Sequence, residues 1–282
     1  MGISVGTGNL CGMTDERATV AVEAAEAGAA VASDAFRGEL TVETKSGDTD
    51  VVTAADREAQ TAVVERIRES FPDDAVVGEE EGAASAVPER GVAWVIDPID
   101  GTNNFVRGMR QYATSVAVVR DGEPVAAANV LPSLGDTYVA AAETTRRNGE
   151  VVEVSDRTDP ALSVVSPTIW WDFDRREEYG RAATAIVERF ADMRRFGCAQ
   201  AALSLVADGG VEGVITNVDT NPWDTIAGVH LVRQAGGRVT DLHGDRWRHD
   251  ATGLVASNGH VHEAVLDAAR DIAPAAERRS ER

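Results

Sequence analysis

Two acids three residues apart, Asp97 and Asp100, constrain this chain most, because they end an apolar run that predicts a strand. Pro98 between them holds its own φ at about −65° and stiffens the turn, so both carboxylates can converge on one hard cation. Gly101 and Thr102 follow directly, where a glycine turn with free N–H groups attracts an anion. The pattern predicts a divalent cation beside a phosphate, although the same residue types also make ordinary strand-ending turns.

Three further segments carry acids that could reach the same place. Glu79 ends a short apolar run that predicts a second strand. Asp224 lies where a helix is predicted to begin, and it is either a metal ligand or a plain N-terminal acid favoured by the helix dipole. Asp56 follows Thr53 by three residues, which is the spacing of a capping box at a helix start. Taken singly, each acid also has an ordinary structural interpretation.

Taken in this order, the segments resemble the inositol monophosphatase family of magnesium-dependent, lithium-sensitive phosphomonoesterases. The motifs are G-E-E, then D-P-I-D-G-T-x-N-F, then P-W-D followed by A-G-G, and the resemblance runs from about Thr14 to about Ala269. It implies an α+β fold built as a five-layer α-β-α-β-α sandwich, with the site where the two halves meet.

The resemblance also implies a set of metal ligands. Glu79, Asp97 and the backbone carbonyl of Ile99 correspond to ligands of a first ion. Asp97, Asp100 and Asp224 correspond to ligands of a second ion, and a third, weaker ion depends on Glu79. The implied cofactor is about two to three Mg²⁺ ions, with Mn²⁺ as an alternative and Li⁺ as an inhibitor.

Three residues are implied to act in catalysis. Thr102 corresponds to the hydroxyl that orients the attacking water, and Asp56 to the acid that hydrogen-bonds this hydroxyl. Glu79, also a ligand of the first ion, is the third implied catalytic residue. Paired metals neutralise phosphate oxygens, lower the pKa of a bound water and stabilise the leaving alkoxide in an in-line displacement. No covalent enzyme intermediate is therefore expected.

Substrate contacts are implied at two turns, which supply Asp100, Gly101, Thr102, Gly197, Cys198 and Ala199. Seven residues before the metal-ligand aspartate, the family often has a glutamate that accepts hydrogen bonds from inositol hydroxyls, and here that residue is Asn217. An amide donates as well as accepts and carries no charge. Fructose 1,6-bisphosphate, histidinol phosphate and other sugar phosphates therefore stand beside inositol 1-phosphate as candidates. Asn217 equally fits a plain strand end.

The chain is strongly acidic, with 47 acidic and 27 basic residues and a formal net charge of −20. This balance disfavours binding to nucleic acid or to an anionic membrane through a broad basic surface. Lys45 is the only lysine. It lies where the family often has a lysine close to metal and phosphate, or else it is a mobile loop residue. Such a surface resembles that of a salt-adapted protein, whose self-repulsion is screened within about 3 Å at about 1 M salt.

The 282 residues, 43% of them hydrophobic, predict two tightly joined halves. Residues 14–146 are expected to form an α+β metal-binding half, and residues 147–272 an α/β half that contributes Asp224 and substrate contacts. The segments 1–13 and 273–282 are expected to be flexible ends. The predicted helices cover 15–36, 53–69, 177–190, 199–206, 223–235 and 260–270, and the predicted strands 92–96, 113–120, 124–131, 137–141, 162–165, 211–216 and 254–256.

The remaining expectations concern location, assembly and activity. No apolar run approaches about 18 residues and the start lacks signal-peptide features, so a cytoplasmic location is expected, with no membrane partner. Two cysteines favour reduced thiols over a disulfide framework. The family's habit implies a homodimer. A catalytically silent relative with a binding or regulatory role is the alternative to an enzyme, and the complete set of acids with Thr102 favours the enzyme.

Overall fold

The computed structural model describes residues 16–38, 42–44, 51–80, 82–169 and 171–272. Lys45, for which a phosphate contact was predicted, lies outside the described residues. The segments 1–13 and 273–282, for which flexibility was predicted, also lie outside them. Within the described ranges, no helix is long and apolar enough to cross a membrane.

The first half is built on a seven-stranded sheet in the order β3-β4-β5-β6-β7-β8-β9. Only β3 and β4 pair in parallel, and the other neighbours are antiparallel, as predicted for this half. The strands are β3 Ala75–Gly78, β4 Val92–Asp100, β5 Ala113–Arg120, β6 Glu123–Leu131, β7 Asp136–Ala141, β8 Thr144–Arg147 and β9 Glu150–Val152.

Two helices, α1 Glu16–Ala35 and α2 Ala54–Ser70, cover the outer face of this sheet. Alanines and valines line the buried face of α1 and pack with Ile67 of α2 and Trp94 of β4 in one cluster. A small ribbon of β1 Val42–Thr44 and β2 Val51–Thr53 precedes α2, and the short helix α3 Thr102–Val106 follows β4. The predicted helices over 15–36 and 53–69 are thus confirmed within the described residues.

The second half is a five-stranded mixed sheet in the order β11-β10-β12-β14-β13. Strand β10 is parallel to β11 and β12, whereas β14 is antiparallel to β12 and β13. The strands are β10 Val164–Pro167, β11 Asp192–Met193, β12 Gly213–Asp219, β13 Arg238–Thr240 and β14 Thr252–Ser257, and the helices are α4 Arg176–Val187, α5 Ala199–Ala207, α6 Pro222–Gln234 and α7 His262–Arg270.

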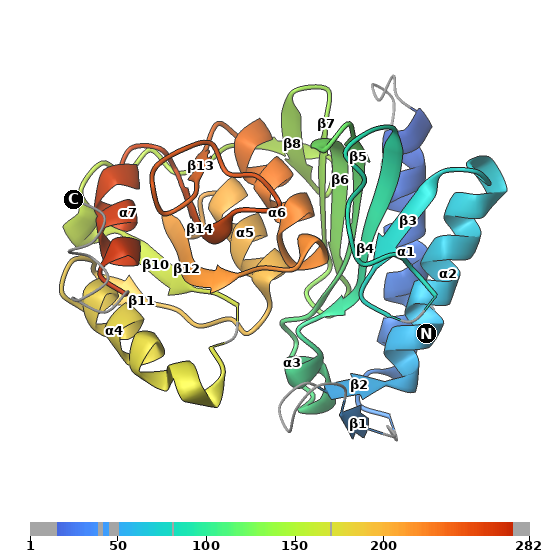
Figure 1. The fold of residues 1–282 in the computed structure, drawn as a ribbon, viewed down its shortest axis with the longest axis horizontal. Coiled ribbons are helices and arrows are strands. Elements are labelled where there is room, and N and C mark those ends of the chain that lie inside the picture. The colour runs from blue at the N-terminus through green and yellow to red at the C-terminus, as the bar shows by residue number, and fades with distance from the viewer. Residues whose placement is uncertain (1–15, 39–41, 45–50, 81, 170, 273–282) are drawn as a thin grey trace.

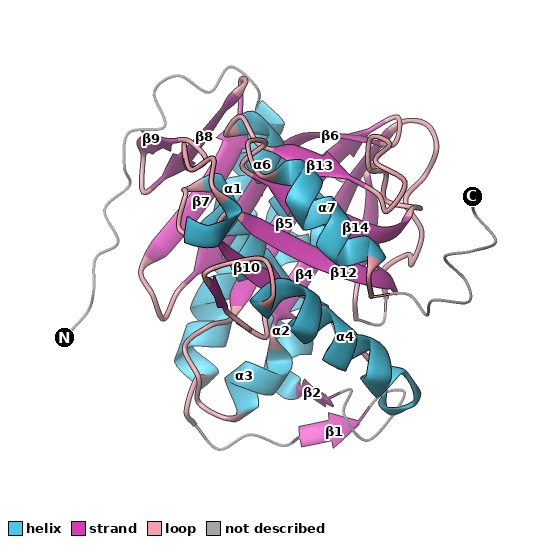
Figure 2. Cartoon of the chain, turned by 90° about the vertical axis from the view of Figure 1, so that its left-hand side faces the viewer, coloured by secondary structure: helices cyan, strands magenta, loops and turns pink. Residues whose placement is uncertain are grey.

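The elements stack as a five-layer α-β-α-β-α sandwich, as expected. Helices α5 and α6 lie between the two sheets, and α4 with α7 covers the far face of the second sheet (Figures 1 and 2). One apolar cluster joins residues of both sheets through the middle helices, including Val95, Leu203 and Val229. The two halves therefore share a core, which fixes β4 against α6.

The structure corrects two predicted strands. The strand predicted over 162–165 starts at Val164, because Asp159 caps a 3-10 turn over Pro160–Leu162 and accepts a hydrogen bond from Ala161 N at 2.9 Å. The strand predicted over 92–96 continues to Asp100 despite Pro98, because its register with β5 shifts between Asp97 and Asp100. A proline without an N–H is tolerated at such a bulge.

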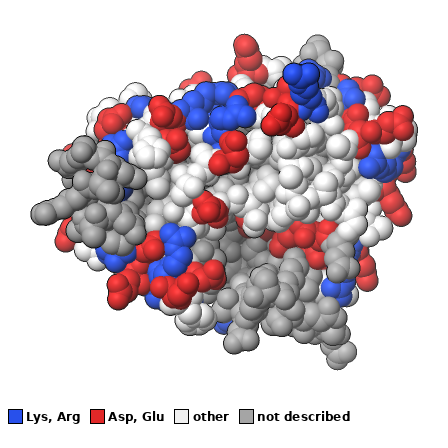
Figure 3. Space-filling view, in the orientation of Figure 1, with Lys and Arg blue, Asp and Glu red and all other residues white. Residues whose placement is uncertain are grey.

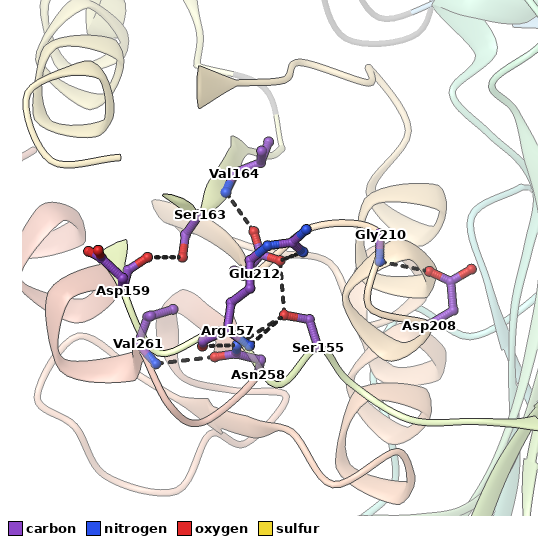
Figure 4. Close-up of polar contacts among 10 residues, drawn as sticks. All are labelled: Ser155, Arg157, Asp159, Ser163, Val164, Asp208, Gly210, Glu212, Asn258 and Val261. Atoms are coloured by element: carbon purple, nitrogen blue, oxygen red, sulfur yellow. Dashed lines mark hydrogen bonds and ion pairs between the residues drawn. The ribbon is translucent and has the colours of Figure 1, made fainter. Parts of the chain in front are cut away.

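The chain that crosses between the halves is fastened at Glu212, whose side chain is 1% exposed. Its carboxylate accepts hydrogen bonds from Ser155 Oγ at 2.9 Å, Arg157 Nη1 at 2.9 Å and Val164 N at 2.6 Å (Figure 4). Three hydrogen-bond donors, one of them the cationic Arg157, compensate the buried charge of Glu212. This polar cluster holds the connection against the second sheet.

Candidate metal centre and active site

Three predicted ligand acids come together at the boundary between the halves. Asp97 and Asp100 lie at the end of β4, and Asp224 lies in the first turn of α6. One carboxylate oxygen from each lies within 4.8 Å of the other two. Asp97 is 1% and Asp100 6% exposed. The sheet and the middle helix layer thus bring distant parts of the chain together in one acidic cluster of Asp97, Asp100 and Asp224.

The turn after Asp100 strongly favours glycine. Gly101 has a φ of +88°, in the left-handed region, and α3 begins at the next residue. A Cβ at this position would lie 3.1 Å from each of Cys198 Cβ, Gln111 O and Gly197 O. Close approach of the second half to this turn therefore adds a steric demand to the conformational one.

Asp56 and Thr102 form the predicted hydroxyl–carboxylate pair. Thr102 Oγ1 lies 3.1 Å from Asp56 Oδ1 and 3.0 Å from the carbonyl oxygen of Ile99, two acceptors for its single proton. Asp56 is fully buried, and its Oδ2 accepts from Thr53 N at 2.8 Å and Thr53 Oγ1 at 2.6 Å. The capping box predicted from Thr53 and Asp56 is confirmed, and it orients the carboxylate toward Thr102.

Burial and mutual repulsion raise the pKa values of the carboxylates in the acidic cluster. Burial, followed by the charges of Glu79, Asp100, Asp224 and Asp56, raises the pKa of Asp97 well above its usual range. Burial and the charges of Asp100 and Glu79 raise the pKa of Asp224 to about 8. Buried carboxylates gathered in this way either take up protons or bind a positive charge.

The donor set fits a divalent hard cation. Among the described residues, Asp97 Oδ1 is buried and has no hydrogen-bond donor. An orphaned carboxylate oxygen within a group of carboxylates is what a ligand of Mg²⁺ or Mn²⁺ would show in the protein alone. Asp97, Asp100 and Asp224 could hold such an ion.

Two other predicted first-ion ligands take different positions. Glu79 follows β3 and is half-buried. It lies outside the 4.8 Å group, although its charge acts on both Asp97 and Asp224. Ile99 is fully buried, and its carbonyl oxygen lies 3.0 Å from Thr102 Oγ1. The structure thus brings both near the acidic cluster without placing Glu79 within it.

The turn Gly197–Cys198–Ala199 lies against Asp100. Cys198 Sγ lies 2.9 Å from Asp100 Oδ2, and the same oxygen accepts a hydrogen bond from Gln200 N at 2.5 Å. Ala199 N also bonds to Asp100. The first N–H groups of helix α5 therefore donate to the Asp100 carboxylate. Burial nevertheless dominates and raises the pKa of Asp100.

Gln200 was not predicted, yet it joins this turn to the start of α6. Its fully buried side chain donates to Trp223 O at 2.7 Å and accepts from Gly228 N at 2.8 Å and Asn129 Nδ2 at 2.9 Å. Trp223 directly precedes Asp224. The side chain therefore sets the first turn of α6 relative to α5, and no local sequence pattern indicates such a contact.

Asn104 is a second contributor that sequence reasoning did not single out. Its Nδ2 donates to the carbonyl oxygens of Gln111 and Phe196, both at 2.7 Å. A Cβ on Gly197 would lie 2.9 Å from Asn104 Oδ1. The asparagine of the D-G-T-x-N-F motif thus ties the turn after β4 to the segment that leads into α5.

Asn217 lies in β12 with both ends of its amide engaged. Its Oδ1 accepts from Trp171 Nε1 at 2.7 Å, and its Nδ2 donates to Glu178. Arg175 also binds Glu178, at 3.1 Å and 2.6 Å, and the pKa of Glu178 is lowered because these hydrogen bonds outweigh burial. The amide uses its donor and its acceptor, as its chemistry predicted, and its role toward a substrate stays a prediction.

Acidic side chains are scattered around the face drawn in Figure 3, with basic side chains among them and an uncharged area between them, so they are not gathered in one place. Near the acidic cluster, the charge of Arg195 lowers the pKa of Asp100 against the effect of burial. Arg195 is half-buried and donates to the carbonyl oxygen of Ile169 at 3.1 Å. It is a basic side chain near the cluster that the sequence analysis did not identify.

Comparisons with known proteins agree with this geometry. The model of the inositol monophosphatase family matches residues 13–273. The fructose-1,6-bisphosphatase/inositol-1-monophosphatase of Thermotoga maritima is 34% identical over 233 residues, which cover 82% of this chain and 87% of that protein. The Nus factor SuhB of Salmonella typhimurium is 31% identical over 259 residues, covering 90% and 95%. The solved IMPase of Thermotoga maritima superposes with a TM-score of 0.82 at 31% identity, covering 92% and 98%.

Proposed function

Because the chain belongs to the inositol monophosphatase family of metal-dependent phosphatases, we propose that it hydrolyses the phosphomonoester of a small polyol or sugar, of the inositol 1-phosphate type. The observation that carries the proposal is the group of Asp97, Asp100 and Asp224 within 4.8 Å, with a buried Asp97 oxygen that no described donor binds. Carboxylates in this arrangement suit a divalent cation that binds phosphate oxygens.

The roles of the chain's own groups follow from their bonds. When bound, divalent cations neutralise phosphate oxygens and lower the pKa of a coordinated water. The Thr102 hydroxyl, when it donates to Asp56 Oδ1, keeps its lone pairs available to accept a hydrogen bond from an attacking water. Asp56 stays an acceptor because Thr53 N and Thr53 Oγ1 both bind its other oxygen. This chain of bonds orients the water toward the phosphorus.

The finer parts of the proposal are the ion count and the ligand set. We propose that the protein binds about two to three Mg²⁺ ions, that Mn²⁺ can replace them and that Li⁺ inhibits the reaction. Glu79 and the Ile99 carbonyl are proposed to complete the ligands of the first ion. Gly101, Thr102, Gly197, Cys198 and Ala199 are proposed to line the phosphate side. A homodimer, a cytoplasmic location and a phosphate contact from Lys45 stay predictions.

A panel of substrates tests the proposal. Phosphate release is measured in concentrated KCl, with and without Mg²⁺, from inositol 1-phosphate, fructose 1,6-bisphosphate, histidinol phosphate and 3′-phosphoadenosine 5′-phosphate. One substrate clearly preferred, with release that depends on Mg²⁺, is the expected result. A preference for fructose 1,6-bisphosphate or histidinol phosphate would keep the reaction and change the substrate. Absence of release from folded protein would refute the phosphatase proposal.

The second candidate function is a binding or regulatory role without turnover. One relative that is 31% identical to this chain is named a Nus factor, which favours considering this role. Against it, Asp56 and Thr102 retain the bonded arrangement that catalysis needs and that a passive scaffold does not. Metal binding without phosphate release from any substrate of the panel would support the regulatory role.

A further inference from the structure

Helix α2 presents a second buried polar side chain one turn after Asp56. Gln60 is 5% exposed, and residues four apart lie on the same face of a helix. We propose that Gln60 is a positioning residue for Glu79. Helix α2 then has two tasks: it carries Asp56, the acid that orients Thr102, and through Gln60 it positions the proposed metal ligand Glu79. This inference rests on the proposed function and adds a residue to its machinery.

Gln60 contacts the residue after Glu79 twice. Its Nε2 donates to the carbonyl oxygen of Glu80 at 3.1 Å, and its Oε1 accepts from Glu80 N at 3.0 Å. The planar amide therefore pairs with the Glu80 backbone as a neighbouring strand would, through one donor and one acceptor. Two such bonds fix the position and the orientation of the backbone that directly follows Glu79.

Gln60 makes these bonds at the point where β3 has ended. Parallel pairing with β4 stops at Gly78, opposite Ile96, and residues 79 and 80 form a bend outside any strand. The backbone also approaches the Gln60 amide closely here, since a Cβ on Gly78 would lie 2.7 Å from Gln60 Oε1. The side chain of Gln60 thus continues, beyond Gly78, the pairing that the sheet supplies before it.

A residue that positions a ligand should change metal affinity more than substrate binding. Loss of a partner in the outer shell of a metal site costs about 10-fold to 100-fold in metal affinity or activity. For Gln60 we expect the lower end of this range, because pairing of β3 with β4 still holds the chain before Glu79.

The experiment compares two variants of the full chain, Gln60→Met and Asn258→Leu. Methionine keeps about the volume of glutamine and loses both bonds. Asn258 is 2% exposed and lies in the second half, where its amide donates to Arg157 O at 2.8 Å and accepts from Val261 N at 3.1 Å (Figure 4). Its amide also donates to Ser155 Oγ at 3.4 Å, so the control loses at least as many amide hydrogen bonds, all of them outside the candidate active site.

Three quantities are measured for each protein: Mn²⁺ binding by electron paramagnetic resonance, the Mg²⁺ concentration for half-activation of phosphate release, and the melting temperature. We expect Gln60→Met to weaken Mn²⁺ binding and to raise the half-activation concentration about 10-fold, with an unchanged substrate KM at saturating Mg²⁺. Asn258→Leu should lower only the melting temperature. If Gln60→Met does not fold, Gln60→Leu, with a shorter and branched side chain, is measured with the same expectation.

Wild-type Mn²⁺ affinity in a folded Gln60 variant would overturn the inference, as would equal weakening in Asn258→Leu. The proposed function fails separately. If the wild type binds Mn²⁺ but releases no phosphate with any substrate, the phosphatase proposal is refuted, while the Mn²⁺ measurement still decides the role of Gln60.

Discussion

Replacing Gly101 by alanine perturbs the turn that joins β4 to α3 in two separable ways. The backbone there has a φ of +88°, which costs an L-residue about 1–2 kcal/mol. The added Cβ would also lie 3.1 Å from Cys198 Cβ and from two carbonyl oxygens, and overpacking of this kind costs about 1–3 kcal/mol. The free energy of unfolding should therefore fall by about 2–5 kcal/mol.

Gly135 supplies the matched control. Its φ is +76° and nothing lies within 4 Å of an added Cβ, so Gly135→Ala carries the conformational cost of about 1–2 kcal/mol alone. Urea unfolding of both variants, followed by tryptophan fluorescence in concentrated KCl, gives the two free energies. Gly101→Ala should also raise the Mg²⁺ half-activation concentration, because displacement of Cys198 moves the start of α5 away from Asp100. Equal losses of stability in the two variants, or unchanged Mg²⁺ dependence in Gly101→Ala, would refute this reasoning.

Three further predictions concern Asp224 and Thr102 in the candidate site and the buried His262. Burial and neighbouring acids raise the pKa of Asp224 to about 8, so its ionised fraction rises about 50-fold from pH 6 to pH 8. Calorimetry should therefore show Mg²⁺ affinity rising by up to that factor over this range. Asp224→Asn should lower the overall Mg²⁺ affinity and weaken its dependence on pH. A pH-independent affinity in the wild type would contradict it. Thr102→Val keeps the shape and removes the hydroxyl, so kcat should fall about 100-fold or more at unchanged Mg²⁺ affinity, and a wild-type kcat would remove Thr102 from the mechanism. Burial lowers the pKa of His262 from 6.5 to about 4, so between these pH values the unfolded chain binds a proton that the folded chain does not, and the free energy of unfolding falls as pH decreases. In urea titrations, the free energy of unfolding of His262→Gln should fall by about 2 kcal/mol less than that of the wild type between pH 7 and pH 5. An identical fall in both proteins would contradict the assignment.

Local patterns predicted the parts of the site that depend on neighbouring residues. The capping box of Thr53 and Asp56 is a three-residue pattern, and it fixes the carboxylate that meets Thr102. Asp97 and Asp100 end a strand that its apolar run predicts. Asp224 could be linked to them only through the resemblance to a known family, because its position in space depends on how α6 packs between the sheets.

Contacts between distant segments could not be predicted. Gln200 and Asn129 are 71 residues apart, and Cys198 and Asp100 are 98 residues apart. These contacts depend on the packing of α5 against the first sheet, which leaves no periodic signal in the sequence. Pro98 even argues locally for a strand end, but pairing with β5 around a bulge overrides that tendency. The salt-adapted character inferred from the acidic composition stays a prediction.

The central claim is that Asp97 holds the divalent cation on which phosphate release depends. The most direct test measures Mg²⁺ binding by calorimetry and phosphate release in parallel, for the wild type and for Asp97→Asn, with circular dichroism to confirm the fold. We predict Mg²⁺-dependent release in the wild type, and in Asp97→Asn a retained fold with neither measurable release nor wild-type Mg²⁺ affinity. Wild-type turnover in Asp97→Asn, or release from the wild type without Mg²⁺, would contradict the assignment of this metal centre.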